Sequence, residues 1–219
     1  MKIDQSHTWP STVEEARTIQ ETLRNLVITT DQLNTPIQHV AGVDVGFYHK
    51  MSRAAVAVLS FPDLQIVETS LAYRPTSFPY IPGFLSFREI PAILDALEKI
   101  KTIPDIILCD GQGTAHRRRL GIACHLGVLI DIPIIGVAKS LLIGKHEELP
   151  EAKGSWQPLI HQNETVGAVL RTRSGVKPLY ISSGHRISLP TAIDYVLCCT
   201  PKYRLPETTR IADKLASDR

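Results

Sequence analysis

The sequence predicts an α/β fold with a central mixed sheet flanked by helices, and two patterns carry that prediction. Residues 38–74 contain three strand-like runs separated by short turns, at 40–48, 53–60 and 65–73. Closely spaced strands of this kind are typical of an antiparallel meander. Residues 105–138 read as strand, helix and strand, the pattern of a parallel βαβ unit. Both kinds of pairing fit one sheet, and we expect a single domain over all 219 residues.

Helices are expected before, between and after these strands. Residues 11–29 form the N-terminal helix, because apolar residues recur there at helical spacing behind a capping hydroxyl residue. Ile90-Pro91 opens a second helix, since proline suits a first helical turn. The remaining helices are expected from His116 to about Ile130, over 189–199, and within a C-terminal extension at about 200–219.

The segment after the βαβ unit is less regular. We expect a loop at 145–160, where glycine and proline interrupt regular structure. Residues 165–171 and 178–182 should pair as a hairpin around Arg173-Ser174-Gly175. Ser183-Gly184-His185-Arg186 is then expected to form a turn that reaches the functional edge of the sheet.

Composition excludes several classes of protein. Hydrophobic residues make up 43% and charged residues 21%, with a formal net charge of +2, so no overall basic field points to nucleic acid. No apolar run is long enough to span a bilayer, and the N-terminus lacks the apolar region of a signal peptide. The four cysteines form no CxxC pair and have apolar neighbours, so we interpret them as reduced core thiols of a cytoplasmic protein.

Three acidic residues occupy places where catalytic groups are common. Asp44 interrupts an apolar run, where an ionised carboxylate is unfavourable unless a cation pairs with it; alternatively it caps a turn. Asp110 ends an apolar strand before a glycine-rich turn. Glu89 precedes the second helix, where the helix dipole alone would account for it. Convergent carboxylates repel one another and an ion of the Mg²⁺ type relieves this, so we predict a divalent-metal site that acts on phosphodiesters.

Residues 74–88 are proline-rich and yet unusually apolar. Three prolines and a glycine prevent regular structure there, while aromatic and aliphatic side chains exceed what a solvent loop needs. Tyr80 lies between two prolines, and a stiff loop of this kind is suited to being pushed between bases. The alternative is a loop that is simply tucked onto the core.

A glycine-rich and basic stretch follows Asp110. Gly111 and Gly113 leave backbone N–H groups available to a phosphate or a base edge. The run His116–Arg119 places basic residues in an expected first helical turn, against the helix dipole, which indicates an anionic ligand or else a solvated basic turn. Lys139 ends the second strand of the βαβ unit, as a functional lysine or as one that extends along the surface into solvent.

Together these motifs resemble the endonuclease V family, and the order of the three acids resembles the ribonuclease H-like fold. The resemblance runs in one collinear order over about residues 15 to 213. The motifs that carry it are Gly42–Gly46, Pro79–Gly83 with Leu85 and Phe87-Arg88-Glu89, Asp110–Gly113 with His116, Gly136–Ser140, Ser183–Arg186 and Tyr203–Pro206.

The resemblance implies an enzyme that needs Mg²⁺, with Mn²⁺ as a substitute. Asp44 and Asp110 would bind the metal, Glu89 would complete the acidic site, and Asp213 would be a fourth member. Family members cut the second phosphodiester on the 3′ side of a deoxyinosine and leave 3′-hydroxyl and 5′-phosphate ends. The implied partner is inosine-containing DNA, single- or double-stranded, with inosine-containing RNA left open. Neither a membrane nor an obligate protein partner is expected.

The resemblance also assigns residues to DNA recognition. A wedge would enter the duplex beside the lesion, formed by Tyr80 with Pro79, Ile81 and Pro82. A pocket would take the flipped hypoxanthine, lined by Gly83, Leu85, Gly111, Gly113 and Gly136. Phosphate would be contacted near the cut by His116 and Lys139, and elsewhere by Arg88, Arg117, Arg118 and Arg119.

Other functions remain open on the sequence alone. A different ribonuclease H-like nuclease, including one that cuts RNA, would use the same metal chemistry without needing the wedge. A non-catalytic binder of damaged nucleic acid would have no need for three convergent acids. A dinucleotide-binding enzyme is disfavoured, because the Gly42–Gly46 run lacks the GxGxxG spacing.

Overall fold

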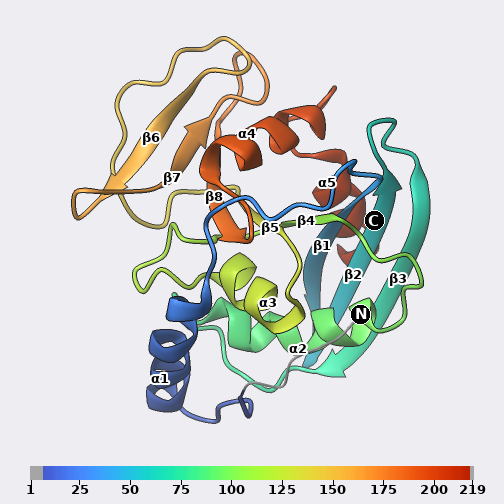
Figure 1. The fold of residues 1–219 in the computed structure, drawn as a ribbon. Coiled ribbons are helices and arrows are strands. Elements are labelled where there is room, and N and C mark those ends of the chain that lie inside the picture. The colour runs from blue at the N-terminus through green and yellow to red at the C-terminus, as the bar shows by residue number, and fades with distance from the viewer. Residues whose placement is uncertain (1–6, 218–219) are drawn as a thin grey trace.

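The fold is built on one eight-stranded mixed sheet, seen in a computed structural model that describes residues 7–217. The strand order is β3-β2-β1-β4-β5-β8-β7-β6 (Figure 1). β1 pairs antiparallel with β2 and parallel with β4, and β4 pairs parallel with β5. The strands are β1 (His39–Tyr48), β2 (Met51–Ser60), β3 (Ile66–Pro75), β4 (Ile106–Cys109), β5 (Ile134–Ala138), β6 (Trp156–His161), β7 (Glu164–Leu170) and β8 (Leu179–His185).

The expected meander and βαβ unit are both present. β1, β2 and β3 follow one another antiparallel, and β4, α3 and β5 form the parallel unit. The apolar run of β2 from Ala54 to Leu59 is fully buried, as a strand covered on both faces requires. The hairpin between β7 and β8 is also confirmed. The turn between β1 and β2 is tighter than expected, because β2 already begins at Met51.

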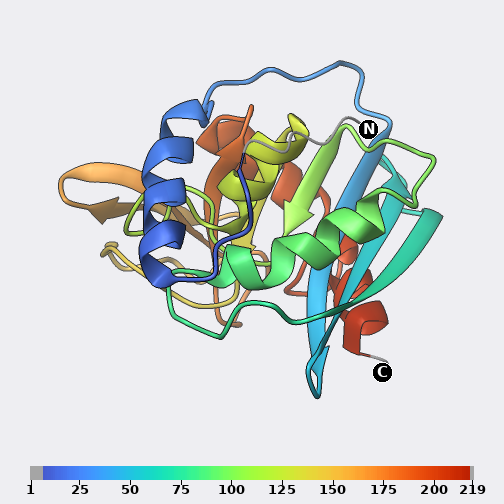
Figure 2. The same cartoon turned by 90° about the horizontal axis from the view of Figure 1, so that it is seen from below.

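Helices cover both faces of the sheet (Figures 1 and 2). One core contains alternate residues of β1 such as Ala41 and Val43 together with apolar residues of α2 and α3. The other contains Val40 and residues of α4 and α5, since successive strand residues face opposite sides. The helices are α1 (Val13–Leu23), α2 (Leu85–Leu97), α3 (Ile122–Ile130), α4 (Leu189–Cys198) and α5 (Glu207–Ser217).

Two glycines of β1 let α5 lie directly against the sheet. A Cβ at Gly42 would stand 2.1 Å from the carbonyl oxygen of Thr208, and one at Gly46 would stand 2.3 Å from that of Ala216. Both distances are far inside van der Waals contact, so no larger residue fits. Asp44 lies between these glycines on the same face of the strand, and α5 therefore returns to the strand that carries the first acid.

Two helix starts and one helix end differ from the expectations. The N-terminal helix stops at Leu23 and continues only as a short 3₁₀ turn, Arg24–Leu26, rather than reaching residue 29. α2 begins at Leu85, so Pro91 lies inside it and not in its first turn. Proline leaves the carbonyl four residues earlier without its helical donor, and the helix tolerates this single loss. Glu89 consequently lies in the second turn of α2.

The basic run His116–Arg119 is not helical, which corrects a second prediction. α3 starts at Ile122, and Arg119 has a φ of +57°, a left-handed conformation that interrupts any helix. The basic residues therefore belong to the loop between β4 and α3, and their supposed conflict with the helix dipole does not exist.

Two strand boundaries were also wrong. Residues 156–160, expected within the loop at 145–160, belong to the edge strand β6; an edge position tolerates Pro158. Residues Ser183–His185, expected as a turn, belong to β8 and pair with β5. Each of these assignments depends on a neighbouring strand that local sequence does not reveal.

No helix within residues 7–217 is long and apolar enough to cross a membrane. The four cysteines are free thiols, and three of them are buried as expected. Cys198 is exposed, because it lies on the solvent side of α4, so the expectation of a core thiol was wrong there.

Candidate active site

Asp44 and Asp110 emerge side by side from neighbouring parallel strands. Val43 of β1 is paired with Cys109 of β4, and each acid is the next residue of its chain. Both side chains point to the face covered by α5, because Val40, Ile106 and Leu108 on the same alternation belong to that core. The register of one strand pair therefore explains why two acids 66 positions apart in the sequence share a site.

Burial and mutual repulsion disfavour ionisation of this pair. Burial raises the pKa of Asp44 to about 7, and the charge of Asp110 contributes to the shift. Burial also raises the pKa of Asp110, although Lys139 opposes that change. Each shift shows that negative charge here is incompletely compensated by the protein.

Glu89 approaches the pair from α2, which covers the opposite face of the sheet. The side chain is 8% exposed, and burial raises the pKa of Glu89 well above its usual range, with further repulsion from Asp44 and Asp110. The charges of Asp44 and Asp110 thus act on Glu89, so the three acids repel one another. The helix position in the second turn carries Glu89 inward, toward the sheet edge where the two aspartates lie.

Lys139 is the counter-ion of the cluster. Its Nζ lies 2.5 Å from Asp110 Oδ2 and 3.6 Å from Asp213 Oδ1. Burial disfavours the ammonium charge, but the neighbouring carboxylate of Asp110 outweighs it and raises the pKa of Lys139. The expectation that the C-terminal helix returns Asp213 toward the sheet is confirmed, and Lys139 lies between two acids.

The chemistry of this cluster fits a hard divalent cation. Lys139 acts on Asp44, Asp110 and Asp213, while Glu89 is repelled by Asp44 and Asp110 and has Arg88 as its nearby cation; carboxylate oxygens are the ligands that Mg²⁺ prefers. Within residues 7–217 no three His, Cys, Asp or Glu side chains already stand together at coordinating distance. Glu89 comes from a different face, and Lys139 holds Asp110 where a metal ion would otherwise neutralise it.

A pocket of about 350 Å³ opens beside the acids. One wall is the segment Tyr80–Gly83 with Leu85, and the facing wall is Asp110–Gln112 with Ile122. Lys139 and Asp110 both line the pocket, so the pocket reaches the acidic cluster at these two residues, whereas Asp44 and Asp213 line a separate cavity. The volume falls in the range of small-ligand sites.

The five glycine and leucine positions expected to line a pocket divide into two groups. Gly83, Leu85 and Gly111 line it. Gly113 and Gly136 lie beneath it: a Cβ at Gly136 would stand 2.4 Å from the backbone nitrogen of Gly113, and one at Gly113 would stand 2.1 Å from the carbonyl oxygen of Ser183. These two glycines allow the 111–113 loop to lie flat on β5 and β8 and so set the position of the wall above.

The loop that carries the wedge residues Pro79–Pro82 combines buried anchors with an exposed tip. Phe78, Phe84 and Phe87 are buried in one cluster with Ala16 of α1. This part of the loop is tucked onto the core, as the alternative interpretation of residues 74–88 predicted. Tyr80 is 69% exposed, and Pro79 and Pro82 are exposed beside it while Ile81 is partly buried. The aromatic anchors thus hold a loop whose tyrosine projects into solvent next to the pocket.

His116 is buried and braced against the wedge segment. Its Nδ1 accepts a hydrogen bond from the backbone N–H of Arg118, and its Nε2 lies 3.1 Å from the carbonyl oxygen of Gly83. Nε2 must therefore carry the proton, which is the neutral tautomer. Burial lowers the pKa of His116 to about 4, and the charge of Arg118 contributes. The residue that was expected to contact phosphate is thus engaged through both ring nitrogens.

The four arginines expected to contact phosphate have different surroundings. Arg88 lies over the ring of Phe47, with 4.1 Å from its Cζ to the ring centroid. Arg118 lies over Phe84, and Arg119 forms an ion pair with Glu164. Arg117 is exposed.

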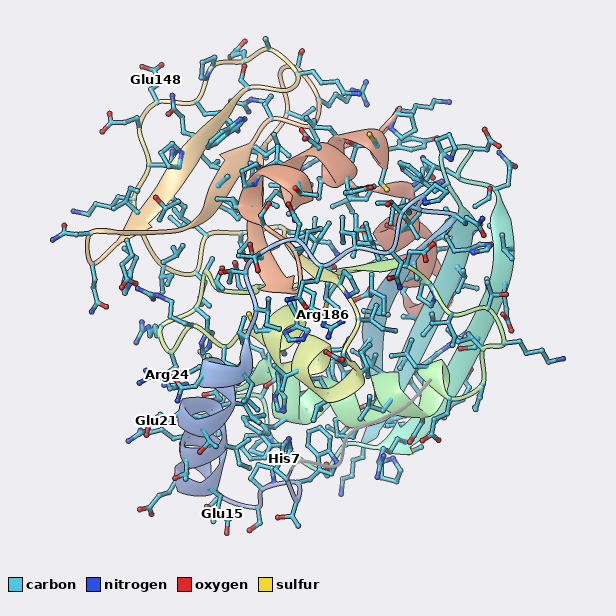
Figure 3. The ribbon with its side chains drawn as sticks, viewed as in Figure 1. His7, Glu15, Glu21, Arg24, Glu148 and Arg186 are labelled. Atoms are coloured by element: carbon cyan, nitrogen blue, oxygen red, sulfur yellow. The ribbon has the colours of Figure 1, made fainter. Side chains whose placement is uncertain are left out.

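His185 does not reach the acidic edge, which corrects an expectation. Its Nε2 lies 3.2 Å from Asp131 Oδ1, and it pairs with Ile134 at the start of β5, whereas Lys139 follows the other end of that strand. Arg186 lies beside α3 with Asp131 as an ion partner at 2.8 Å (Figure 3). His185 and Arg186 therefore support the fold at the opposite strand ends from Lys139, whereas Ser183 lies beneath the 111–113 loop.

Two residues at the pocket were missed from the sequence. Gln20 of α1 lines the pocket and is 1% exposed; a glutamine on the apolar face of an amphipathic helix was the available signal. Gln112 also lines the pocket, and its Nε2 donates a hydrogen bond to the carbonyl oxygen of Ser140 at 3.0 Å. This bond joins the loop after β4 to the loop after β5.

Comparisons with known proteins agree over nearly the whole chain. The family model for Endonuclease V matches residues 21–214. An Endonuclease V from Trichormus variabilis is 79% identical over 221 residues and covers 100% of both chains. The crystal structure of Endonuclease V from Streptomyces avermitilis has a TM-score of 0.91 and 45% identity, covering 99% of this chain and 96% of that one.

A third relative is known with nucleic acid bound. The crystal structure of Ciona intestinalis Endonuclease V, in complex with a 24mer DNA containing an inosine followed by a ribo-adenosine, has a TM-score of 0.82 and 33% identity. It covers 93% of this chain and 95% of that chain. These likenesses confirm the ribonuclease H-like fold expected from the order of the acids. The chain is therefore a nuclease that belongs to the endonuclease V family.

Proposed function

We propose that this protein is a Mg²⁺-dependent repair endonuclease that nicks DNA at deoxyinosine. The cut would fall at the second phosphodiester on the 3′ side of the lesion and leave 3′-hydroxyl and 5′-phosphate ends. The observation that carries the proposal is a pocket of about 350 Å³ that is lined by both Asp110 of the acidic cluster and the exposed Tyr80. The Ciona relative bound to inosine-containing DNA supports the same substrate.

The metal would be held by Asp44 and Asp110, with Glu89 and Asp213 completing the acidic site. When bound, Mg²⁺ (or Mn²⁺ as a substitute) would neutralise the phosphate charge and lower the pKa of water. The protein's own contribution is placement: the parallel register of β1 and β4 fixes the two aspartates, and Lys139 opposes the rise in the pKa of Asp110 that burial causes. Lys139, 39% exposed beside Asp110, is also suitably placed to meet a phosphate oxygen.

The wedge and the pocket would act together on the lesion. Extruding a base is easier where pairing is weak, and inosine pairs poorly with most partners. Tyr80 would fill the place that the base leaves, held by the buried anchors Phe78 and Phe84. The pocket wall that includes Gly83 and Gly111 would take up hypoxanthine and disfavour the exocyclic amine of adenine.

Affinity without sequence information would come from basic residues around the site. Arg117 is exposed and Arg88 is half-buried, and both are candidates to contact a backbone phosphate, whereas Arg118 and His116 would act mainly by holding the wedge. Binding should then weaken with salt. A cytoplasmic location is proposed on the free cysteines, three of them buried.

A nicking assay tests the proposal. End-labelled substrates would carry one deoxyinosine in a duplex, no lesion, or one inosine in RNA, each with Mg²⁺ and with EDTA. We expect a metal-dependent nick one nucleotide beyond the deoxyinosine and none in the undamaged duplex. Cutting of the RNA alone would transfer the function to RNA processing and overturn the DNA assignment.

Matched variants separate a nuclease from a binder. Asp110→Asn should abolish cutting and preserve lesion binding, because the amide keeps the shape of the site without its charge. Asp63→Asn is the control, since Asp63 is exposed on the turn after β2 at the other edge of the sheet. Lesion binding by the unaltered protein, without any cutting, would make it a binding module.

A further inference from the structure

Gln20 is the single polar side chain on the buried face of α1. The helix is held by a capping box between Thr12 and Glu15, and its buried residues are Ala16, Gln20 and Leu23. Its outer side carries Glu15, Glu21 and Arg24, which lie along the edge of the molecule in Figure 3. Apolar packing alone would not select glutamine at a position that is 1% exposed.

Three donors converge on the carbonyl oxygen of Gly83. Gln20 Nε2 lies 3.0 Å from it, Arg118 Nη2 lies 3.0 Å from it and His116 Nε2 lies 3.1 Å from it. A carbonyl oxygen has two lone pairs, so this acceptor is saturated and its peptide plane is fixed. Gly83 has a φ of +84°, a conformation that glycine adopts readily.

The amide of Gln20 suits this place in a way that no other side chain would. Its Oε1 accepts a hydrogen bond from Arg118 Nε at 2.5 Å, and its Nε2 also lies 3.4 Å from the carbonyl oxygen of Leu120. Arginine can only donate and backbone carbonyls can only accept, so the orientation of the amide is determined by its partners. A carboxylate would lack the donors, and an apolar side chain would lack both.

These bonds join the two walls of the pocket. Gly83 ends the wedge segment that begins at Pro79, whereas His116, Arg118 and Leu120 belong to the loop between β4 and α3. Gln20, Gly83, His116 and Leu120 all line the pocket. Helix α1 therefore fixes the distance between the wedge and the opposite wall, from a residue just outside the span matched by the family model.

We propose that Gln20 is a positioning residue that holds the Gly83 carbonyl and thereby sets the wedge and pocket in the geometry that captures the lesion. The proposal rests on the function proposed above. It places Gln20 in lesion capture and not in bond cutting, because Gln20 touches neither Asp44 nor Asp110. Loss of its amide should weaken binding of the damaged base while the saturated rate is preserved.

The test compares Gln20→Met with the unaltered protein. Methionine keeps the length and the apolar packing but neither donates nor accepts at the end of the side chain. The equilibrium Kd is measured in Ca²⁺ for duplexes with and without deoxyinosine, and the single-turnover rate is measured in Mg²⁺ at saturating enzyme. We expect the Kd for the deoxyinosine duplex to rise about tenfold, with the Kd for undamaged duplex and the saturated rate each within about twofold of the unaltered protein.

Leu23→Ala is the control on the same helix. Leu23 is buried but makes no contact with the Gly83 carbonyl, so its truncation should lower the melting temperature without changing lesion selectivity. Gln20→Glu is a second variant, which keeps the Arg118 partner and loses both donors; it should lose selectivity as Gln20→Met does, and it serves alone if the methionine variant does not fold.

The outcomes distinguish this inference from the proposed function. Failure of the unaltered protein to cut the deoxyinosine duplex would overturn the function. Normal cutting with an unchanged Kd ratio in Gln20→Met or Gln20→Glu would overturn the role of Gln20 alone. Equal loss of selectivity in Leu23→Ala would mean that general destabilisation of α1 explains the effect, which also overturns it.

Discussion

Asp44 and Asp110 stand at equivalent positions on two neighbouring parallel strands, each one residue beyond the paired Val43 and Cys109. Lys139 follows the next parallel strand and lies 2.5 Å from Asp110. The consecutive strands β1, β4 and β5 thus place Asp44, Asp110 and Lys139 side by side at their carboxyl ends. Electrostatic balance at this edge governs the behaviour that the following experiments measure.

Replacing Lys139 should shift the pH dependence of cutting toward higher pH. Lys139 lowers the pKa of both Asp44 and Asp110, so Lys139→Met should leave their pKa values higher. If cutting needs ionised carboxylates, the acidic limb of the pH–rate profile then moves to higher pH, by on the order of one unit. The single-turnover rate measured from pH 6 to 9 gives the shift.

Two further variants control this experiment. Lys139→Arg keeps the positive charge and should leave the acidic limb of the pH–rate profile near its original pH, even if the cutting rate itself is lower. Lys145→Met removes an exposed lysine after β5 and should change neither quantity. An unshifted limb in Lys139→Met would show that the lysine does not tune the acids.

Mg²⁺ should stabilise the folded protein more at pH 8 than at pH 6. Protons and metal compete for the same carboxylates, and Asp44 has a pKa raised to about 7 by burial first and then by Asp110. Thermal unfolding with and without Mg²⁺ measures the difference, independently of cutting. The melting-temperature gain should be largely lost in Asp110→Asn and retained in Asp63→Asn; a gain equal at both pH values would contradict competition at Asp44.

Tyr80→Ala should weaken lesion recognition without loss of stability. Tyr80 is 69% exposed, so its truncation removes little packing, whereas base–aromatic stacking contributes about 1–3 kcal/mol. We expect on the order of tenfold weaker binding of a deoxyinosine duplex at an unchanged melting temperature. Tyr48→Ala is the matched control, because Tyr48 is 74% exposed on the β1–β2 hairpin; equal losses in both variants would argue against a special role for Tyr80.

His125 should make the protein less stable as the pH falls below neutral. Its Nδ1 is 3.0 Å from Ser86 Oγ and its Nε2 is 2.8 Å from His7 Nε2. Burial lowers its pKa from 6.5 to about 3. Between these values the unfolded chain binds a proton that the folded chain does not, so the contribution of His125 is intact above pH 6.5 and is lost as pH falls toward 3.

For a pKa shift of this direction and size, the free energy of unfolding should fall by about 2 kcal/mol between neutral pH and pH 5. The free energy of unfolding in urea is compared at pH 7.5 and 5.0 for the unaltered protein and His125→Gln. Subtracting the pH dependence of His125→Gln from that of the unaltered protein gives the contribution of His125 alone. The buried acids cancel in this subtraction; their raised pKa values act with the opposite sign. His146→Gln, at an exposed position, should match the unaltered protein; a pH slope unchanged by His125→Gln would contradict the assignment.

Local patterns were sufficient for much of the fold and for the identity of the acids. Strand-like runs separated by short turns predicted the meander, and an acid after an apolar strand predicted Asp110 at the edge of the sheet. The family resemblance added Asp213, which α5 brings to 3.6 Å from Lys139. These features could be predicted because each depends on a few neighbouring residues or on one motif.

Other features were beyond local patterns. Pro91 could open a helix or lie within one, and only the docking of Phe87 into the aromatic cluster with Phe78 selects the earlier start at Leu85. His116 read as a free basic residue, although burial against Gly83 makes it a neutral brace. Gln20 read as one more residue of an amphipathic helix.

The sequence by itself determined the α/β class and predicted the three acids and a stiff apolar loop that carries Tyr80, because side-chain type and spacing directly encode burial, turns and charge. Only the tertiary structure decided that Gly113 and Gly136 support the pocket from beneath, that His185 lies at the far edge, and that Gln20 meets Gly83. These relationships join residues 20 to 70 positions apart, and strand register and helix docking determine them. Both arise from burying the whole apolar surface at once, a condition that no short stretch of sequence contains.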